Sequence, residues 1–365
     1  MIILFQSSFS SKIGGPARSL IMLLSVLDAS KIRYFSIVHY CDKYPLFERG
    51  LIDRAIKYNS LRGMKFGIKS IYHLFHKMLN PDNILWVNGL WDPICLLAIM
   101  ASILFKSKVL VQPKGALDSP GLSKHKTIKK IIIYFLRKYK SKILFIYTSE
   151  LEKKSFLCLG LNNVSRFTYY SNLNRSLKDK DFYPSPDSKS LNIVFLSRLD
   201  PKKGLLESLL ELSHNPPECI LRIDIYGDGD SEYVDELKRI KYSRNIQVSF
   251  KGWIAEKSLE FYDNYHYFWL PTKYENFGIS VLEAISFGCP ILTTRESSWE
   301  NIVEYNCGLI KKDTETWAHF FDRAIEKYSK EALVLRRNAL GLAGQFNFHK
   351  SQMDLQNIVV KTGIR

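Results

Sequence analysis

The sequence is poor in cysteine, with six in 365 residues, and no two of them lie close together in the chain. Scattered cysteines form neither a CxxC metal or redox motif nor a disulfide framework, so we expect mostly reduced, buried thiols. Long apolar runs are also missing. The longest, residues 94–105, has 12 residues, whereas a helix needs roughly 18 to 20 to cross a bilayer. These absences argue against a disulfide-stapled secreted domain and against a membrane-spanning protein.

The chain begins MIILFQSS, with no basic residue ahead of its apolar segment. We interpret this segment as a first core strand rather than a secretory signal peptide. A cytoplasmic location is therefore expected. The protein could also attach peripherally to the inner face of the cell membrane.

Acidic residues are scarce in the first half of the chain. Residues 1–190 carry 12 Asp and Glu against 30 Lys and Arg, a net +18, whereas residues 191–365 carry 24 against 22, a net −2. The excess of +16 in the whole chain therefore belongs to the first half. Such an excess favours an anionic partner, which could be nucleic acid, a membrane surface or a phosphorylated substrate. The asymmetry indicates two domains with different partners.

Short apolar runs alternate with helical patterns along the chain, and this alternation predicts parallel sheets covered on both faces. Candidate strands in the first half are residues 2–5, 34–39, 83–87, 108–112 and 143–147. Those in the second half are residues 192–196, 222–226, 247–250, 267–270 and 290–293. We predict an α/β protein of two Rossmann-like, doubly wound parallel-sheet lobes, which bind ligands at the carboxyl ends of their strands.

Residues 176–190, SLKDKDFYPSPDSKS, combine Pro, Ser and Asp with no apolar period and are the best linker candidate. We place the first domain at residues 1–180 and the second at 181–345. A C-terminal helix is expected over residues 346–365, packing back on the first domain.

Residues 271–290, PTKYENFGISVLEAISFGCP, form the most specific segment. Gly278 opens a predicted helix and Gly288 closes it, as a glycine after the last turn often does. Glu283 lies inside this otherwise apolar helix, where an unpaired carboxylate would cost free energy. Free amides at the helix start suit an anion or a hydroxyl. A solvated Glu275 and an ion-paired Glu283 would explain the pattern about equally well.

A second segment, LSRLDPKKG at residues 196–204, follows a predicted strand. Asp200 suits a helix N-cap and the next residue, a proline, suits the first helical position. Lys202 and Lys203 then fall in the first turn, where the helix dipole disfavours cations, which suggests a bound anion. Charge-assisted hydrogen bonds from Arg198 and Lys203 contribute roughly 1.5 to 3 kcal/mol each, enough to anchor a diphosphate. A solvated basic turn is the alternative.

The sequence ENFGISVLE, a Glu, seven residues and a second Glu, resembles the donor-binding motif of retaining glycosyltransferases of family 4. The resemblance implies the GT-B fold, with two Rossmann-like domains facing a cleft. It implies that Glu275 contacts hydroxyls of the donor sugar and that Glu283 accepts hydrogen bonds from the nucleotide ribose. The amides facing the sugar and diphosphate would be those of Asn276, Phe277, Gly278 and Ile279.

The segment containing Ser197, Arg198 and Lys203 resembles the diphosphate grip of the same family. By this resemblance Glu275, Arg198 and Lys203 are the catalytic residues and Ser197 is a donor-binding residue. The glycine-rich turn IYGDGD follows another predicted strand. In the family this turn lies near the nucleotide. The resemblance therefore implies that the backbone of Gly227 and Gly229 and the ring of Trp253 bind the donor.

In the first half, KIGGPARS follows the first predicted strand. The resemblance implies that this loop, with Gly15 and Arg18, closes over the phosphate of the donor. It is not a GxGxxG fingerprint, and no acidic residue follows at the right distance, so a dinucleotide oxidoreductase is disfavoured. Matches to the family extend from here to SSWENIVEYNCG at residues 297–308, nearly the whole chain.

Three further first-half segments resemble the family: VNGLWDP, QPKGALD and YTSELEKK. The first two supply the acceptor-side residues Asn88, Trp91 and Lys114. Many family members have a His at the position of Lys114, facing the reacting sugar, and none of the eight histidines lies in these segments. A His general base is therefore not supported. The retaining reaction is often described as a front-face displacement in which the leaving phosphate assists the acceptor hydroxyl, so loss of this His need not abolish activity.

Residues 124–142, KHKTIKKIIIYFLRKYKSK, hold much of the positive charge. At helical spacing they combine basic residues with an apolar stripe of Ile128, Ile131, Ile132, Phe135 and Tyr139. A basic amphipathic helix with aromatic residues can lie on an anionic membrane. A packed helix with a solvated basic face is equally consistent with the pattern.

Together these features predict transfer of a hexose or N-acetylhexosamine from a nucleotide-diphosphate sugar to a lipid-linked oligosaccharide or polysaccharide, as in O-antigen, capsule or lipopolysaccharide assembly. No metal or other cofactor is expected, because no DxD-like acidic pair follows a strand where a phosphate-bound cation would lie. The alternatives are a GT-B protein that only binds or epimerises a nucleotide sugar and a transferase for a soluble acceptor. A nucleic-acid-binding protein is less favoured, since no such binding motif is present.

Overall fold

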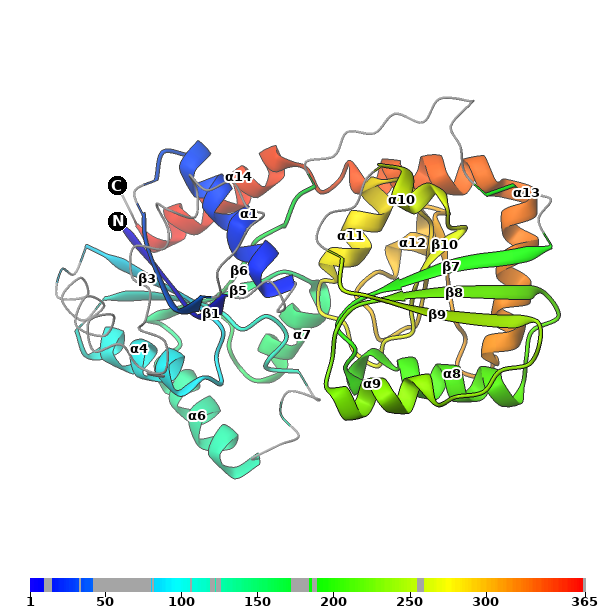
Figure 1. The fold of residues 1–365 in the computed structure, drawn as a ribbon. Coiled ribbons are helices and arrows are strands. Elements are labelled where there is room, and N and C mark those ends of the chain that lie inside the picture. The colour runs from blue at the N-terminus through cyan, green and yellow to red at the C-terminus, as the bar shows by residue number, and fades with distance from the viewer. Residues whose placement is uncertain are drawn as a thin grey trace. The chain divides into compact units, whose positions relative to one another are not determined.

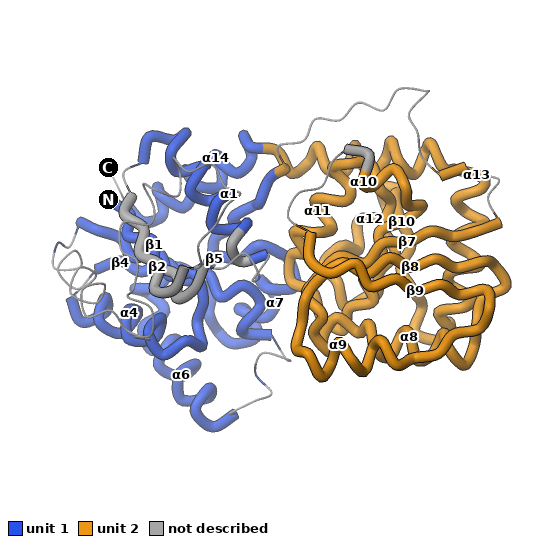
Figure 2. Tube along the Cα trace, viewed as in Figure 1, with its two compact units in different colours: residues 1–170, 348–365 blue, residues 171–347 orange. Residues whose placement is uncertain are grey.

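The computed structural model describes residues 1–9, 15–32, 34–41, 80, 82–105, 107–118, 122, 126–171, 184–185, 189–254 and 259–363. The chain forms two compact units, one of residues 1–170 and 348–365 and the other of residues 171–347 (Figure 2). The units therefore divide after residue 170 and again after residue 347. Most of the predicted linker, residues 176–190, lies outside the described residues.

The first unit contains a six-stranded parallel sheet in the order β2-β1-β3-β4-β5-β6 (Figure 1). Its strands are β1 (Ile2–Phe9), β2 (Tyr34–Cys41), β3 (Ile84–Asn88), β4 (Lys108–Gln112), β5 (Ile143–Tyr147) and β6 (Val164–Arg166). The helices described here are α1 (Gly15–Ala29), α4 (Pro93–Leu104), α6 (Lys126–Lys138), α7 (Glu150–Cys158) and α14 (Phe348–Thr362). The C-terminal helix α14 thus belongs to this unit, where Asp354 accepts a hydrogen bond of 2.9 Å from the Thr168 amide.

Most strands of this sheet contain an apolar run, as expected for a parallel sheet that helices cover on both faces. All five residues of β3 are buried, as expected for a strand of a parallel sheet between helix layers. Local caps fix the helix starts. Asp92 accepts a hydrogen bond of 2.9 Å from the Ile94 amide at the start of α4, and the Ser149 side chain caps α7 by accepting from the Glu152 amide.

The second unit repeats the plan, with a six-stranded sheet in the order β12-β11-β10-β7-β8-β9. Its strands are β7 (Ser190–Leu196), β8 (Ile220–Tyr226), β9 (Ile246–Gly252), β10 (Tyr267–Leu270), β11 (Ile291–Thr293) and β12 (Gly308–Ile310). Its described helices are a 3₁₀ turn η2 (Pro201–Lys203), α8 (Leu205–His214), α9 (Ser231–Lys238), α10 (Leu259–Asp263), α11 (Ile279–Ser286), α12 (Asn301–Glu304) and α13 (Trp317–Ala343). Two parallel sheets layered with helices confirm the predicted α/β class.

A fully buried arginine joins helix ends in the second unit. Arg336 of α13 has no exposed surface. Its guanidinium donates to the carbonyl oxygens of Gly288 at 3.1 Å, Tyr262 at 3.2 Å and Tyr265 at 3.1 Å. These carbonyls end or follow α10 and α11, where helix dipoles favour a cation. Arg336 therefore fixes these helix ends where the chain turns to enter β10 and β11.

Helix α6 buries only part of the predicted apolar stripe. Ile132, Phe135 and Tyr139 pack against the core of the first unit, whereas Ile128 is 60% and Ile131 65% exposed. The predicted stripe is therefore divided between the core and the surface. Among the described residues, no helix combines the length and apolar character needed to cross a membrane.

Candidate functional site

The loop after β7 begins the candidate site. Asp200 accepts a hydrogen bond of 3.1 Å from the Lys202 amide and caps η2, as predicted. The predicted helical turn is different, however. Gly204, with φ of +69°, ends η2 and starts α8, so Lys202 and Lys203 lie before the first turn of α8. The expectation that these cations oppose the dipole of a long helix is wrong, because a left-handed glycine separates them from it.

Three glycines of this region are required by close approach of the chain to itself. A Cβ on Gly204 would lie 2.0 Å from the carbonyl oxygen of Pro271, and one on Gly227 would lie 1.9 Å from that of Ser197. At Gly229 the corresponding distance to the Leu199 oxygen is 2.2 Å. Such contacts are sterically forbidden. The close approach of the β7 loop backbone therefore explains why glycine stands at positions 227 and 229. The two glycines are not evidence that a nucleotide binds there.

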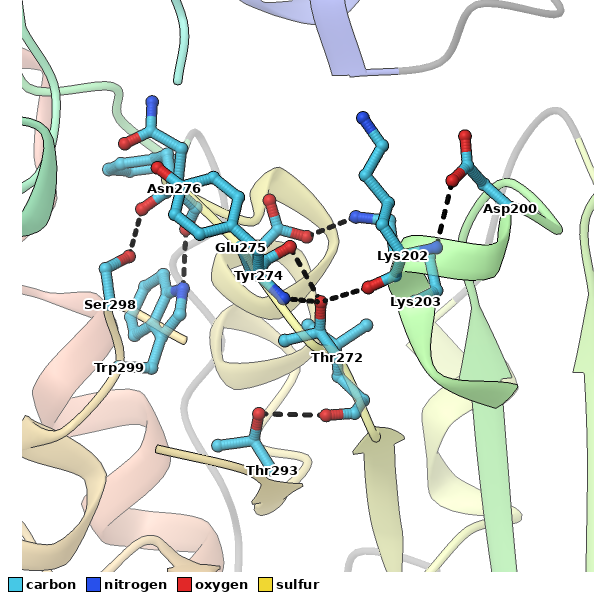
Figure 3. A network of polar contacts seen from close by, with 12 residues as sticks. Asp200, Lys202, Lys203, Thr272, Tyr274, Glu275, Asn276, Thr293, Ser298 and Trp299 are labelled. Atoms are coloured by element: carbon cyan, nitrogen blue, oxygen red, sulfur yellow. Dashed lines mark hydrogen bonds and ion pairs between the residues drawn. The ribbon is translucent and has the colours of Figure 1, made fainter. Parts of the chain in front are cut away.

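The loop after β10 is tied to the loop after β7 through Thr272 (Figure 3). The Thr272 hydroxyl lies 2.8 Å from the Tyr274 carbonyl oxygen and 3.2 Å from that of Lys202. The Lys273 amide also donates to the Lys202 carbonyl, at 2.9 Å. These bonds hold the two loops together at the carboxyl ends of neighbouring strands β7 and β10.

An ion pair lies between these loops. The Lys203 ammonium is 2.6 Å from Oε2 of Glu275, and the two side chains are only 11% and 15% exposed. Figure 3 shows both groups pointing toward each other from η2 and from the loop before α11. Two residues predicted to contact different parts of a donor, the diphosphate and the sugar, are thus brought together.

Other cations of the β7 loop are exposed. Arg198 and Lys202 lie on the surface of the unit, whereas Lys203 is buried. Ser197 extends the strand, since its amide donates to the Tyr226 carbonyl oxygen at 3.2 Å. This loop therefore offers two exposed cations beside one that is buried and paired, an arrangement that suits a diphosphate.

The predicted helix opening at Gly278 is confirmed, with φ of +69° at the N-cap of α11. The preceding residues are held by the chain after β11. The Ser298 hydroxyl donates to the Asn276 carbonyl oxygen, and the Trp299 indole donates to that of Phe277 at 2.5 Å. The Phe277 ring packs against the Trp299 ring, so its side chain serves the core.

The remaining donor-side predictions lie around this helix and the end of β9. Ile279 is half-buried in the first turn of α11, and Glu283 is half-buried on the same helix. The predicted burial of Glu283 is therefore only partial. Trp253, directly after β9, is 46% exposed.

No sequence pattern pointed to Thr272, Ser298 or Trp299 as site residues. Trp299 lies within a segment that resembles the family, but its bond to a carbonyl 22 residues away has no local sequence signal. Thr272 bonds across 70 residues to the β7 loop. In the described residues, no group of three or more His, Cys, Asp or Glu side chains could hold a metal ion.

The first unit carries the other predicted site residues. Gly15 starts α1, where an added Cβ would meet nothing within 4 Å, and Arg18 is half-buried in the first turn. Trp91 donates from its indole to the Ala116 carbonyl oxygen at 2.6 Å and lies under the Lys129 ammonium, 4.9 Å from the ring centre. Trp91 therefore fixes the loop after β4 to α6.

Asn88 and Lys114 follow the neighbouring strands β3 and β4. Asn88 is 4% exposed. The Lys114 ammonium lies 2.9 Å from the Ser19 hydroxyl of α1, and burial lowers the pKa of Lys114 to about 7 against the opposing charge of Glu152. The structure thus gives two clusters, one at the carboxyl strand ends of each unit.

Parts of this chain are similar to known proteins. Residues 178–345 match the family model described as Glycosyl transferases group 1. The second half of this chain is therefore similar to that family. A stretch of 123 residues is 27% identical to the mannosylfructose-phosphate synthase of Agrobacterium fabrum, covering 31% of this chain and 27% of that protein. The match thus spans about a quarter of the length of this curated relative.

Solved structures match over nearly the whole chain. Anabaena Alr3699/HepE, in complex with UDP and glucose, is similar with a TM-score of 0.70 at 17% identity, covering 98% of this chain and 99% of that one. WaaG, a glycosyltransferase involved in lipopolysaccharide biosynthesis, is similar with a TM-score of 0.63 at 13% identity, covering 98% and 99%. These likenesses confirm the predicted GT-B fold.

Proposed function

We propose that this protein is a retaining glycosyltransferase that moves a hexose or N-acetylhexosamine from a nucleotide-diphosphate sugar to a lipid-linked or polysaccharide acceptor. The observation that carries the proposal is the Lys203–Glu275 pair, with the exposed Arg198 in the same loop as Lys203 at the carboxyl end of β7. Cations and a carboxylate at one strand end suit a ligand that has both phosphates and hydroxyls. The similar structure in complex with UDP and glucose supports this choice of donor.

In this proposal the bond between the anomeric carbon and the diphosphate oxygen breaks while the acceptor oxygen bonds the same face of that carbon. The acceptor proton passes to the leaving phosphate. Arg198 and Lys203 stabilise the charge that develops on the diphosphate, an electrostatic role that needs no metal ion. Glu275 accepts hydrogen bonds from the sugar hydroxyls once the donor has displaced Lys203 from the Glu275 carboxylate.

The experiment measures thermal stabilisation of the purified protein by UDP, GDP and ADP, followed by their sugars and by donor hydrolysis. A specific donor raises the melting temperature by mass action. Arg198→Ala should weaken stabilisation by the nucleotide, and Glu275→Ala should abolish sugar hydrolysis while keeping nucleotide binding. The proposal fails if no nucleotide sugar binds or reacts and Glu275→Ala behaves as wild type.

We also propose that the acceptor is presented at an anionic membrane surface, and that the protein lies there peripherally. Helix α6 leaves Ile128, Ile131 and Tyr134 exposed among basic residues. Helix α4 adds exposed apolar side chains at Leu97, Met100 and Leu104. Both helices bury other residues in one core cluster of the first unit. We call these six side chains the α4–α6 surface.

The chemistry of this surface favours lipid. Apolar side chains enter the boundary between headgroups and acyl chains, while neighbouring lysines attract anionic headgroups. The net charge of +18 in residues 1–190 adds to that attraction. The similarity to WaaG, named for lipopolysaccharide biosynthesis, supports a lipid-linked acceptor. The relative named mannosylfructose-phosphate synthase supports the alternative of a soluble acceptor, and vesicle binding distinguishes the two.

A further inference from the structure

A buried amide in the first unit lacks hydrogen bonds. Asn88 ends β3 and is paired in register with Gln112 of β4, so the two side chains lie on one face of the sheet. The Gln112 amide donates to the Tyr169 hydroxyl at 2.9 Å. Within the described part of the chain, neither the nitrogen nor the oxygen of the Asn88 side chain has a partner. Because buried polar groups in folded proteins are nearly always paired, this amide needs an explanation.

A lysine follows the neighbouring strand with most of its hydrogen-bonding capacity unused. Lys114 has φ of +56°, a backbone conformation that residues other than glycine rarely adopt. Its ammonium has three donor hydrogens, and in the described part of the chain the Ser19 hydroxyl is its hydrogen-bond partner. Strained backbone of this kind persists where the surrounding structure holds it, often at ligand sites. The strand ends thus present Asn88 and Lys114 together.

The nearby carboxylate is already engaged. Glu152 of α7 has no exposed surface, and one oxygen accepts from the Gly115 amide at 2.7 Å. The other accepts from the amide and hydroxyl of Thr148 at 2.9 and 3.1 Å. Glu152 therefore ties the loop after β4 to the loop after β5. It acts on Lys114 through space and is not its ion-pair partner in the described contacts.

We propose that Asn88 and Lys114 form a subsite that binds an anionic substituent, a carboxylate or a phosphate, of a sugar substrate. The inference rests on the proposed function only in taking the substrate to be a sugar. A neutral hydroxyl would satisfy hydrogen bonds but would leave the buried ammonium without a counter-ion in direct contact. An anion supplies that counter-ion and also accepts hydrogen bonds from the Asn88 amide.

The subsite predicts a pH dependence with a definite sign. Glu152 from α7 and Cys95 from α4 are the titratable groups that act on Lys114, and Ser19 from α1 links it to Tyr169. Since burial lowers the pKa of Lys114 to about 7, the free amine loses its proton near neutral pH. An anion binds the protonated form, so its affinity falls as pH rises from about 6 to about 8.5, and the bound anion raises the pKa.

The test measures binding of D-glucuronate, glucose 6-phosphate and glucose by ligand-observed NMR at about pH 6 and about pH 8.5, on either side of the lysine pKa. We expect at least one anion to bind at least about tenfold more tightly than glucose at the lower pH, and Lys114→Met to remove that preference. Lys114→Arg should keep the preference and bind glucuronate equally at both pH values, because neither its guanidinium nor the glucuronate carboxylate titrates in this range. Lys130→Met, at an exposed position of α6, is the matched control and should behave as wild type.

Each outcome bears on the proposal. Preference for glucuronate alone or for the phosphate alone supports it and identifies the anion. Equal binding of glucose, or an unchanged preference in Lys114→Met, overturns it. If the Met variant does not fold, Lys114→Arg still decides through its loss of pH dependence. UDP binding and donor hydrolysis are measured on the same proteins. If UDP binding and donor hydrolysis are absent but the anion preference remains, the proposed function is contradicted and the subsite is not. If UDP binding and donor hydrolysis are present but the anion preference is absent, only the subsite is overturned.

Discussion

The Lys203 ammonium lies 2.6 Å from the Glu275 carboxylate, although 72 residues separate the two in the chain. Each side chain comes from a loop at the carboxyl end of a different strand, β7 or β10. Both are largely buried, so each charge depends on the other for its main partner. A ligand that binds either group therefore has to compete with an existing ion pair.

The first prediction concerns the strength of this pair. Lys203→Met and Glu275→Gln should each lower the free energy of unfolding by about 1 to 3 kcal/mol, because each leaves a mostly buried partner unpaired. The double variant should lose less than the sum, giving a coupling of about 1 kcal/mol or more in a double-mutant cycle. Urea denaturation measures all four proteins.

The exposed pair Lys273–Glu207 is the control for this cycle. Its charges are 2.5 Å apart, but the side chains are 52% and 53% exposed. Exposed pairs contribute roughly 0 to 1 kcal/mol, so its cycle should give a coupling below that of Lys203–Glu275. Equal couplings in the two cycles would show that burial has no influence on the first pair.

The second prediction concerns the glycine after β8. Gly227→Ala should lower the free energy of unfolding by about 3 kcal/mol or more, or prevent folding, because its Cβ would lie 1.9 Å from the Ser197 carbonyl oxygen and φ is +145°. Gly15→Ala is the matched control, since nothing lies within 4 Å of its Cβ position. It should change stability by less than about 1 kcal/mol. Thermal unfolding that shows the two variants equally stable would contradict the clash.

The sequence predicted those parts of the site that obey local rules. Asp200 at a cap, Gly278 opening α11 and Gly288 after its last turn depend on a few neighbouring residues, and each lies where the pattern indicated. Periodicity likewise identified most strands of both sheets. The short β6 and β12 were missed, although the equally short β11 was identified.

What could not be predicted depends on contacts between distant segments. Thr272 bonds to the β7 loop, and Trp299 bonds to the Phe277 carbonyl, and neither sequence neighbourhood differs from an ordinary loop. The helix predicted to begin after Asp200 is broken at Gly204, whose left-handed backbone lies against the Pro271 carbonyl oxygen. Chain packing also decided which residues of the α6 stripe became exposed.

The third prediction concerns acid stability. Burial lowers the pKa of His266 from 6.5 to about 4, and its Nδ1 accepts a hydrogen bond of 3.0 Å from the Asn192 amide. Between these pH values the unfolded chain binds a proton that the folded protein does not. The free energy of unfolding therefore falls as pH is lowered from about 6.5 to about 4, by up to about 3 kcal/mol from this residue.

His266→Gln should reduce this acid-induced loss, as measured by urea denaturation at about pH 7 and about pH 5, which span most of the affected range. His214→Gln, at the exposed end of α8, is the control and should keep the wild-type loss. If His266→Gln retains the full difference between the two pH values, the acid sensitivity arises from other groups.

The last prediction tests the α4–α6 surface. Replacing Ile128, Ile131 and Tyr134 by Ser should reduce flotation with vesicles that contain anionic lipid at least about fivefold, because three exposed apolar side chains no longer enter the headgroup boundary. Binding of the wild type should also weaken as salt is raised, since lysine attraction to the surface is screened. Leu210→Ser, on the second unit and 40% exposed, controls for loss of surface apolarity in general. Wild-type binding to neutral vesicles as strong as to anionic ones would contradict the role of charge, and absence of binding to both would favour the soluble acceptor.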